Sequence, residues 1–122
     1  QYRLPVKIFI LNNEYMGMVR QWQELLHGGR YSESYSSSLP DFVKLAEAYG
    51  GVGIRCSDPA ALDDAIMEMI DTPRPVIFDC LVAKEENCFP MIPSGKAHNE
   101  MILPDVEQDI GAVIDEKGKM LV

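Results

Sequence analysis

A strand, a polar turn and a helix follow one another near the start of the chain, and this order constrains the fold most. The apolar, β-branched run at residues 6–11 is too short to span a membrane and stops abruptly at Asn12 and Asn13. Beyond Gly17 the pattern has the period of a helix. In an open parallel sheet, ligands bind outside the carboxyl ends of the strands, where side chains converge on the bound group. Asn12 and Asn13 occupy such a position.

The composition and charge of the chain limit which partners it can bind. The chain has 122 residues, of which 47% are hydrophobic and 25% charged, as expected for a globular domain with a core. Its net charge of -8 repels nucleic acid and anionic lipid, and its arginines are scattered. No apolar run approaches the roughly 20 residues of a membrane span, and no leader sequence is recognisable. We therefore expect a soluble, cytoplasmic protein that binds neither nucleic acid nor membranes.

The segment after Gly17 predicts a helix with one apolar face that ends at residues 27–29, which contain two glycines. A loop rich in Ser and Tyr follows at residues 30–38. The apolar positions of the predicted helix are Met18, Val19, Trp22, Leu25 and Leu26.

Two further helices and two further strands complete the pattern. A helix at residues 40–49 has Ser38 as its predicted N-cap and Pro40 in its first turn. Residues 52–56 and 76–83 are apolar and predict strands, with a helix between them. Strands that alternate with helices favour parallel pairing and right-handed crossovers. The fold class is therefore α/β, half of an open parallel sheet with crossover helices.

We assign residues 1–86 to this α/β domain and residues 87–122 to a C-terminal arm, which is rich in proline and contains an acidic helix near residues 105–114. The first five residues give almost no lead-in to a strand of the fully buried type, and buried parallel strands need neighbours on both sides. The chain therefore looks cut from a longer protein.

The cysteines do not form a metal or disulfide motif. Cys56 and Cys80 lie in apolar strands and are interpreted as small buried residues, whereas Cys88 lies in a loop. Neither histidine is close to a cysteine in the sequence, so a nucleophilic role is not favoured.

The asparagine pair admits two interpretations. Amide oxygens, with a carboxylate and phosphates, are ligands that Mg²⁺ accepts. By itself, however, an Asn-Asn pair more often forms a turn by binding its own backbone. Glu14, next to the pair, is interpreted as a solvated side chain.

A longer stretch resembles the catalytic subunit of acetohydroxyacid synthase, also called acetolactate synthase. The resemblance covers roughly residues 4–105, whereas the asparagine pair alone indicates only the wider thiamine-diphosphate-dependent group. The segments that carry it are Leu11-Asn12-Asn13, Tyr15-Met16-Gly17-Met18-Val19-Arg20-Gln21-Trp22-Gln23, Arg30-Tyr31-Ser32, Pro40-Asp41-Phe42-Val43-Lys44-Leu45-Ala46-Glu47-Ala48, Arg74-Pro75-Val76 and Pro90-Met91-Ile92-Pro93-Ser94-Gly95.

The resemblance implies the C-terminal half of a thiamine-diphosphate-binding (pyrophosphate) domain. In that family the enzyme decarboxylates pyruvate and joins the two-carbon unit to a second 2-ketoacid, in branched-chain amino-acid biosynthesis. Mg²⁺ anchors the diphosphate and is held by an upstream Asp that is absent from this sequence, by the side chain of Asn13 and by the backbone carbonyl of Tyr15. FAD binds mainly outside the corresponding segment. The isolated chain is therefore expected to be inactive.

The resemblance also assigns roles near the turn. Asn12, Asn13, Gly17 and Met18 are expected to contact the cofactor. Gly17, Met18 and Val19 are expected to form a loop that closes over the cofactor, with Trp22 facing the second substrate. Ser94 is expected to line the substrate channel. On pattern alone, the stripe of Met18 and Trp22 is more often core than site, and Ser94 is equally well a turn residue.

The expected partners are 2-ketoacid substrates, further copies of the chain in a dimer or tetramer, and a regulatory subunit. Two rival classes stay open. A different thiamine-diphosphate enzyme, such as a pyruvate decarboxylase or oxidase, would keep the asparagine pair but not residues 18–22. A stand-alone acidic α/β interaction or regulatory module would need no catalytic parts.

Overall fold

The computed structural model describes residues 4–104 of the chain, so the acidic helix predicted near residues 105–114 lies outside the described residues. The described part separates into two compact units, with the boundary between Glu86 and Asn87. The first unit contains the sheet and the three α-helices. The roles that we assigned to residues 1–86 and 87–122 stay predictions.

The first unit is built on a parallel sheet of three strands, β1 (Lys7–Asn12), β2 (Val52–Cys56) and β3 (Val76–Leu81), in the order β1-β3-β2. This confirms the predicted α/β class and parallel pairing. β1 begins one residue later than predicted and includes Asn12, because Asn12 pairs with Leu81. β3 ends at Leu81, two residues earlier than predicted, although Val82 N–H still donates to the Asn12 carbonyl at 3.1 Å.

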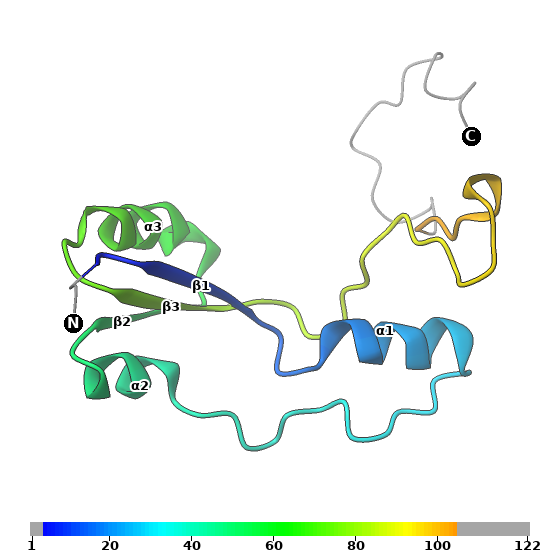
Figure 1. The fold of residues 1–122 in the computed structure, drawn as a ribbon, viewed down its shortest axis with the longest axis horizontal. Helices are drawn as coiled ribbons and strands as arrows, with labels where there is room; N and C mark the ends of the chain where they lie inside the picture. Colours follow the sequence, from blue (N-terminus) through cyan, green and yellow to red (C-terminus); the bar gives the residue numbers. More distant parts are fainter. Residues whose placement is uncertain (1–3, 105–122) are drawn as a thin grey trace, which may run out of the picture. The chain divides into compact units, whose positions relative to one another are not determined.

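Two helices cover opposite faces of the sheet (Figure 1). α3 (Leu62–Asp71) packs on the face with the apolar core, which contains Ile54, Cys56, Met69, Val76, Phe78 and Cys80. The burial of Cys56 and Cys80 agrees with the prediction. α2 (Phe42–Ala48) lies against the other face, over Gly53. A Cβ atom at Gly53 would lie only 2.4 Å from the Cα atom of Val43, so this glycine permits the close approach of α2.

The predicted cap of α2 was wrong. Asp41, not Ser38, caps the helix, and its carboxylate accepts hydrogen bonds from the backbone N–H groups of Val43 (3.1 Å) and Lys44 (3.3 Å). Asp41 has an extended backbone directly before the first helical residue, which is where a cap must lie. Pro40 therefore precedes the helix instead of occupying its first turn.

β1 is less buried than its sequence predicted. Phe9 is 41% exposed and Leu11 is 68% exposed, although the Phe9 ring makes an edge contact with Phe78 at 4.6 Å between centroids. The reason is that β1 is an edge strand in the described part of the chain, paired only with β3. Apolar surface that a doubly flanked strand would bury is left open.

α1 (Gly17–Leu26) also differs from expectation, because it buries polar residues and exposes its apolar stripe. Arg20 is buried: it forms an ion pair with Glu24 at 2.7 Å and lies over the rings of Tyr15 and Tyr31 at 5.4 and 5.3 Å. The core interpretation of Met18 and Trp22 is therefore not supported, since both are exposed.

The second unit is described to residue 104. Met91 and Ile102 form an antiparallel bridge around a short 3-10 helix, His98–Glu100. Between residues 4 and 104, no helix combines the length and apolar character that crossing a membrane requires.

Candidate functional site

The turn after β1 is closed by the side chains of both asparagines. The Oδ1 atom of Asn12 accepts the backbone N–H of Glu14 at 3.1 Å, and Oδ1 of Asn13 accepts the backbone N–H of Tyr15 at 3.2 Å. These are Asx turns, in which a short amide side chain replaces a backbone acceptor. The turn-forming interpretation of the pair is therefore correct, and it does not use all of the lone pairs of the two oxygens.

Glu14 lies in the middle of this turn with a φ of 60°, in the left-handed region that residues with a side chain rarely adopt. Such conformations persist only where the surroundings enforce them, and they concentrate at functional sites. The Glu14 carboxylate accepts hydrogen bonds from Lys84 and from the hydroxyl of Tyr35. The bond from Lys84, followed by that from Tyr35, lowers the pKa of Glu14. Its side chain is therefore held, not simply solvated as we expected.

The loop after α1 is fastened to the same turn. Tyr15 and Tyr35 form an isolated antiparallel bridge, in which Met16 N–H donates to the Ser34 carbonyl and Ser36 N–H donates to the Glu14 carbonyl, both at 2.8 Å. Among the backbone hydrogen bonds of the turns and loops within residues 4–104, none ends on the carbonyl oxygen of Tyr15. This oxygen and Oδ1 of Asn13 are therefore the candidate ligand atoms of the turn.

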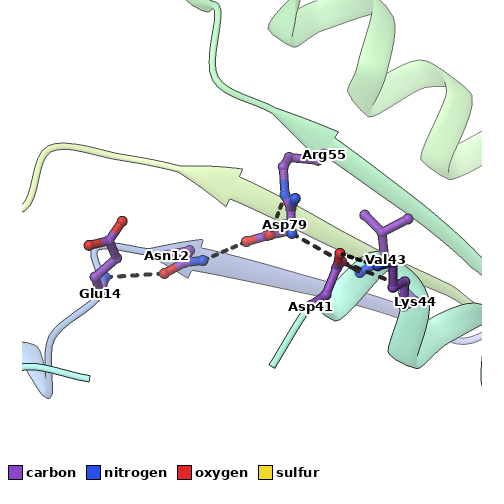
Figure 2. Close-up of polar contacts among 7 residues, drawn as sticks. All are labelled: Asn12, Glu14, Asp41, Val43, Lys44, Arg55 and Asp79. Carbon is purple, nitrogen blue, oxygen red and sulfur yellow. Dashed lines mark hydrogen bonds and ion pairs between the residues drawn. The ribbon is translucent and has the colours of Figure 1, made fainter. Parts of the chain in front are cut away.

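A buried carboxylate that sequence reasoning missed lies behind the turn. Asp79, in the middle strand β3, is 1% exposed. It accepts hydrogen bonds from Asn12 Nδ2 and from Arg55 Nε, each at 2.8 Å, and Arg55 also reaches Asp41 at 3.2 Å (Figure 2). The bond to Asp79 raises the pKa of Arg55. The available signal was a single acid in an otherwise apolar strand, because a buried charge needs a partner.

Two of the hollows near the turn are lined by candidate site residues. One, of about 440 Å³, is polar and includes Asn12, Glu14, Arg55 and Asp79 in its lining. The other, of about 520 Å³, follows the exposed face of α1 and is lined by Met18, Val19, Trp22, Gln23, His27 and Arg30. The three residues of α1 with a predicted role, Met18, Val19 and Trp22, thus share one surface.

The predicted site residues therefore fall into three places. Asn12, Asn13, Tyr15 and Gly17 belong to one turn and the first residue of α1. Met18, Val19 and Trp22 share the hollow on α1. Ser94 lies in the second unit, exposed and in a turn that Lys96 N–H closes onto the Pro93 carbonyl at 3.1 Å. Its predicted place in a substrate channel stays a prediction.

The turn suits a hard cation and an anionic group. Its ligand atoms are an amide oxygen and a carbonyl oxygen, and hard cations such as Mg²⁺ prefer oxygen ligands. Within residues 4–104, no group of three or more His, Cys, Asp or Glu side chains could hold a metal ion. α1 begins immediately after the turn without a side-chain cap or an acidic residue in its first turn. Uncapped N–H groups at a helix N-terminus attract phosphate. A Cβ atom at Gly17 would lie 3.1 Å from Asn13 Nδ2, so the glycine permits the Asn13 side chain to lie close to the first residue of α1.

Comparison with known proteins agrees with this geometry. Residues 1–80 match the family described as thiamine pyrophosphate enzyme, C-terminal TPP binding domain. The chain is 48% identical over 103 residues to the acetolactate synthase large subunit of Cyanidium caldarium, covering 84% of this chain and 18% of the relative. It is 44% identical over 110 residues to that of Haemophilus influenzae, covering 89% of this chain and 19% of the relative.

The isozyme 3 large subunit of acetolactate synthase from Escherichia coli is 46% identical over 111 residues, covering 88% of this chain and 19% of the relative. The chain thus spans about a fifth of the length of the curated relatives it matches. Because the family model covers most of the chain, including all but the last residue of the sheet, this protein belongs to the family of thiamine pyrophosphate enzymes and carries their C-terminal TPP-binding domain.

Proposed function

We propose that this chain is part of an acetolactate synthase. The complete enzyme decarboxylates pyruvate on thiamine diphosphate and joins the two-carbon unit to a second 2-ketoacid, giving acetolactate or acetohydroxybutyrate. The observation that carries this proposal is the identity of 44–48% to acetolactate synthase large subunits over 84–89% of the chain. The asparagine turn at the carboxyl end of β1 supports it, because this is where an α/β sheet binds its ligand.

Asn13 Oδ1 and the Tyr15 carbonyl oxygen would hold Mg²⁺. Both belong to the same Asx turn, so the backbone fixes their spacing before any metal binds. Mg²⁺ prefers near-octahedral oxygen ligands that usually include a carboxylate, and we infer that an Asp outside these 122 residues supplies it. Asn12, in the same turn, would contact the cofactor. When bound, thiamine diphosphate supplies the electron sink for decarboxylation.

The first turns of α1 would form the wall of the active site. Gly17 permits the close approach of the Asn13 side chain to the start of α1. Met18 and Val19 would exclude water from the cofactor, since both are apolar and exposed in the described structure. Trp22 lines the same hollow and would face the second 2-ketoacid. Ser94 would line the channel through which substrate enters.

The remaining partners follow from the same proposal. FAD would bind mainly outside this chain, and the complete protein would form a cytoplasmic homodimer or homotetramer with a regulatory subunit as a further partner. The 122-residue chain alone is expected to form no acetolactate and to bind thiamine diphosphate weakly at best. Binding of thiamine diphosphate to the isolated chain at micromolar concentration in a calorimeter would contradict this expectation.

The test of the metal assignment is Asn13→Ala in the complete enzyme. Loss of a ligand or of a buried polar partner costs about 1 to 3 kcal/mol, so the Mg²⁺ and thiamine diphosphate concentrations for half-maximal activity should rise roughly 10- to 100-fold. Asn12→Ala should act through the geometry of the turn. Equal metal dependence of wild type and Asn13→Ala would refute the assignment.

The products decide between this enzyme and other members of the wider group. Acetolactate as the main product from pyruvate supports the proposal. Acetaldehyde would instead identify a decarboxylase.

A further inference from the structure

Asp79 uses both of its carboxylate oxygens to join the two outer strands of the sheet. Oδ1 accepts the hydrogen bond from Asn12 of β1, and Oδ2 accepts the hydrogen bond from Arg55 of β2, each at 2.8 Å. Asp79 itself lies in the central strand β3, opposite Arg55 in the register. All three side chains gather near the carboxyl ends of the strands (Figure 2).

Stability alone does not account for an acid at this position. Removing a carboxylate from water costs several kcal/mol, and well-packed apolar residues often serve as well as a buried ion pair. The apolar core, moreover, lies on the opposite face of the sheet, under α3. The better-attested use of a buried polar group is to fix one arrangement among several.

The arrangement that Asp79 fixes is the orientation of the Asn12 amide. Both carboxylate oxygens of Asp79 accept hydrogen bonds, so the NH₂ group of Asn12 must face Asp79. The amide oxygen then points toward Glu14 N–H, which it binds at 3.1 Å. This bond starts the turn that continues with Asn13 and Tyr15.

Arg55 holds the Asp79 side chain in place. It donates Nε–H to Asp79 and also forms an ion pair with Asp41 at 3.2 Å. Asp41 is itself bound by the first N–H groups of α2. The carboxylate that orients Asn12 is thus supported from the opposite edge strand and from a helix cap.

We propose that Asp79, held by Arg55, is a positioning residue for the metal turn, defined as residues 12–15. It contacts no metal or substrate and acts through Asn12. This inference rests on the proposed function, because it assumes that the turn binds Mg²⁺ through Asn13 and Tyr15.

The experiment uses Asp79→Asn in the complete enzyme. An amide can donate as well as accept, so the orientation of Asn12 is no longer fixed, and Arg55 loses one of its two ion-pair partners. Mutation of groups that orient metal ligands typically lowers metal affinity about 10- to 100-fold, and we expect the Mg²⁺ concentration for half-maximal activity to rise by about 10-fold or more. At saturating Mg²⁺, kcat should largely recover.

Asp58→Asn is the matched control. Asp58 follows the end of β2 and caps a 3-10 helix, Pro59–Ala61. It lines a hollow together with Cys56 and Cys80, which belong to the core on the face of the sheet opposite Asp79. Because Asn caps as well as Asp, the control should leave the Mg²⁺ requirement unchanged. Arg55→Lys keeps the positive charge but loses the Nε–H donor, and it should raise the requirement less than Asp79→Asn. It also serves as the test if Asp79→Asn does not fold.

A double variant identifies the route. If Asp79 acts through Asn12, Asn12→Ala with Asp79→Asn should need no more Mg²⁺ than Asn12→Ala alone. A folded Asp79→Asn enzyme with a lowered melting temperature and an unchanged Mg²⁺ requirement would overturn this inference, provided that Asn13→Ala raises the requirement. If Asn13→Ala also leaves it unchanged, the proposed metal site itself is wrong.

Discussion

Replacing Gly53 with alanine tests the packing that places α2 on the sheet. A Cβ atom there would lie 2.4 Å from Val43 Cα, 2.7 Å from Val43 O and 2.8 Å from Val43 Cγ1. Carbon atoms in contact are normally about 3.5 to 4.0 Å apart, so the helix would have to move by roughly 1 Å. The two closest atoms belong to the backbone, which a change of side-chain rotamer cannot displace.

The cost can be estimated from two opposing effects. Overpacking a tight contact costs about 1 to 3 kcal/mol, and a backbone clash belongs at the upper end. Alanine recovers roughly 0.5 to 1 kcal/mol of conformational entropy relative to glycine within a strand. We expect a net loss of about 2 kcal/mol in the free energy of unfolding.

Thermal unfolding of the complete protein measures this loss, which should appear as a melting temperature lower by several degrees. The double variant with Val43→Ala is the control. It removes Cγ1 but neither of the two backbone contacts, so it should restore little stability. A Gly53→Ala protein as stable as wild type would refute the close seating of α2 on β2.

Three further outcomes can be checked. Trp22→Leu should lower the preference for 2-ketobutyrate over pyruvate as acceptor about 10-fold with little change in melting temperature, because Trp22 is 42% exposed. An unchanged product ratio with a lowered melting temperature would make Trp22 a packing residue. The hydrogen bond from Lys84 lowers the pKa of Glu14. The stabilising effect of this bond should therefore be complete above the ordinary pKa of 4.5 and be lost as the pH falls through the lowered pKa. Lys84→Ala should raise the pKa of Glu14, which an NMR titration would measure. Burial raises the pKa of Cys80, so iodoacetamide should label it more slowly than the exposed Cys88, as mass spectrometry of the native protein would show.

The predictable part of the fold is the part that local pattern determines. The apolar runs at residues 52–56 and 76–81 become strands because β-branched residues separated by helical stretches leave few other arrangements. The cap at Asp41 was missed because Ser38 fits the same pattern and only the backbone distinguishes them. The exposure of β1 depends on which strands flank it, and its sequence contains no information about them.

The candidate site shows why sequence reasoning located the turn but not its support. Asn12, Asn13 and Gly17 are close in sequence, so their chemistry is visible in one short segment. Asp79 is 67 residues from Asn12 and reaches it only because β3 lies between β1 and β2. Strand order is a property of the whole sheet, and no local pattern encodes it.

The two interpretations of the asparagine pair turn out to be compatible. Each amide oxygen spends one lone pair on closing the turn, as most such pairs do. An amide oxygen has a second lone pair, which in Asn13 could accept a ligand. If Asn13 Oδ1 and the Tyr15 carbonyl oxygen hold Mg²⁺ as proposed, the bond from Tyr15 N–H that forms the turn would also hold the Asn13 amide in place for the metal. The formation of a turn at the carboxyl end of a parallel strand therefore does not argue against the proposed metal site.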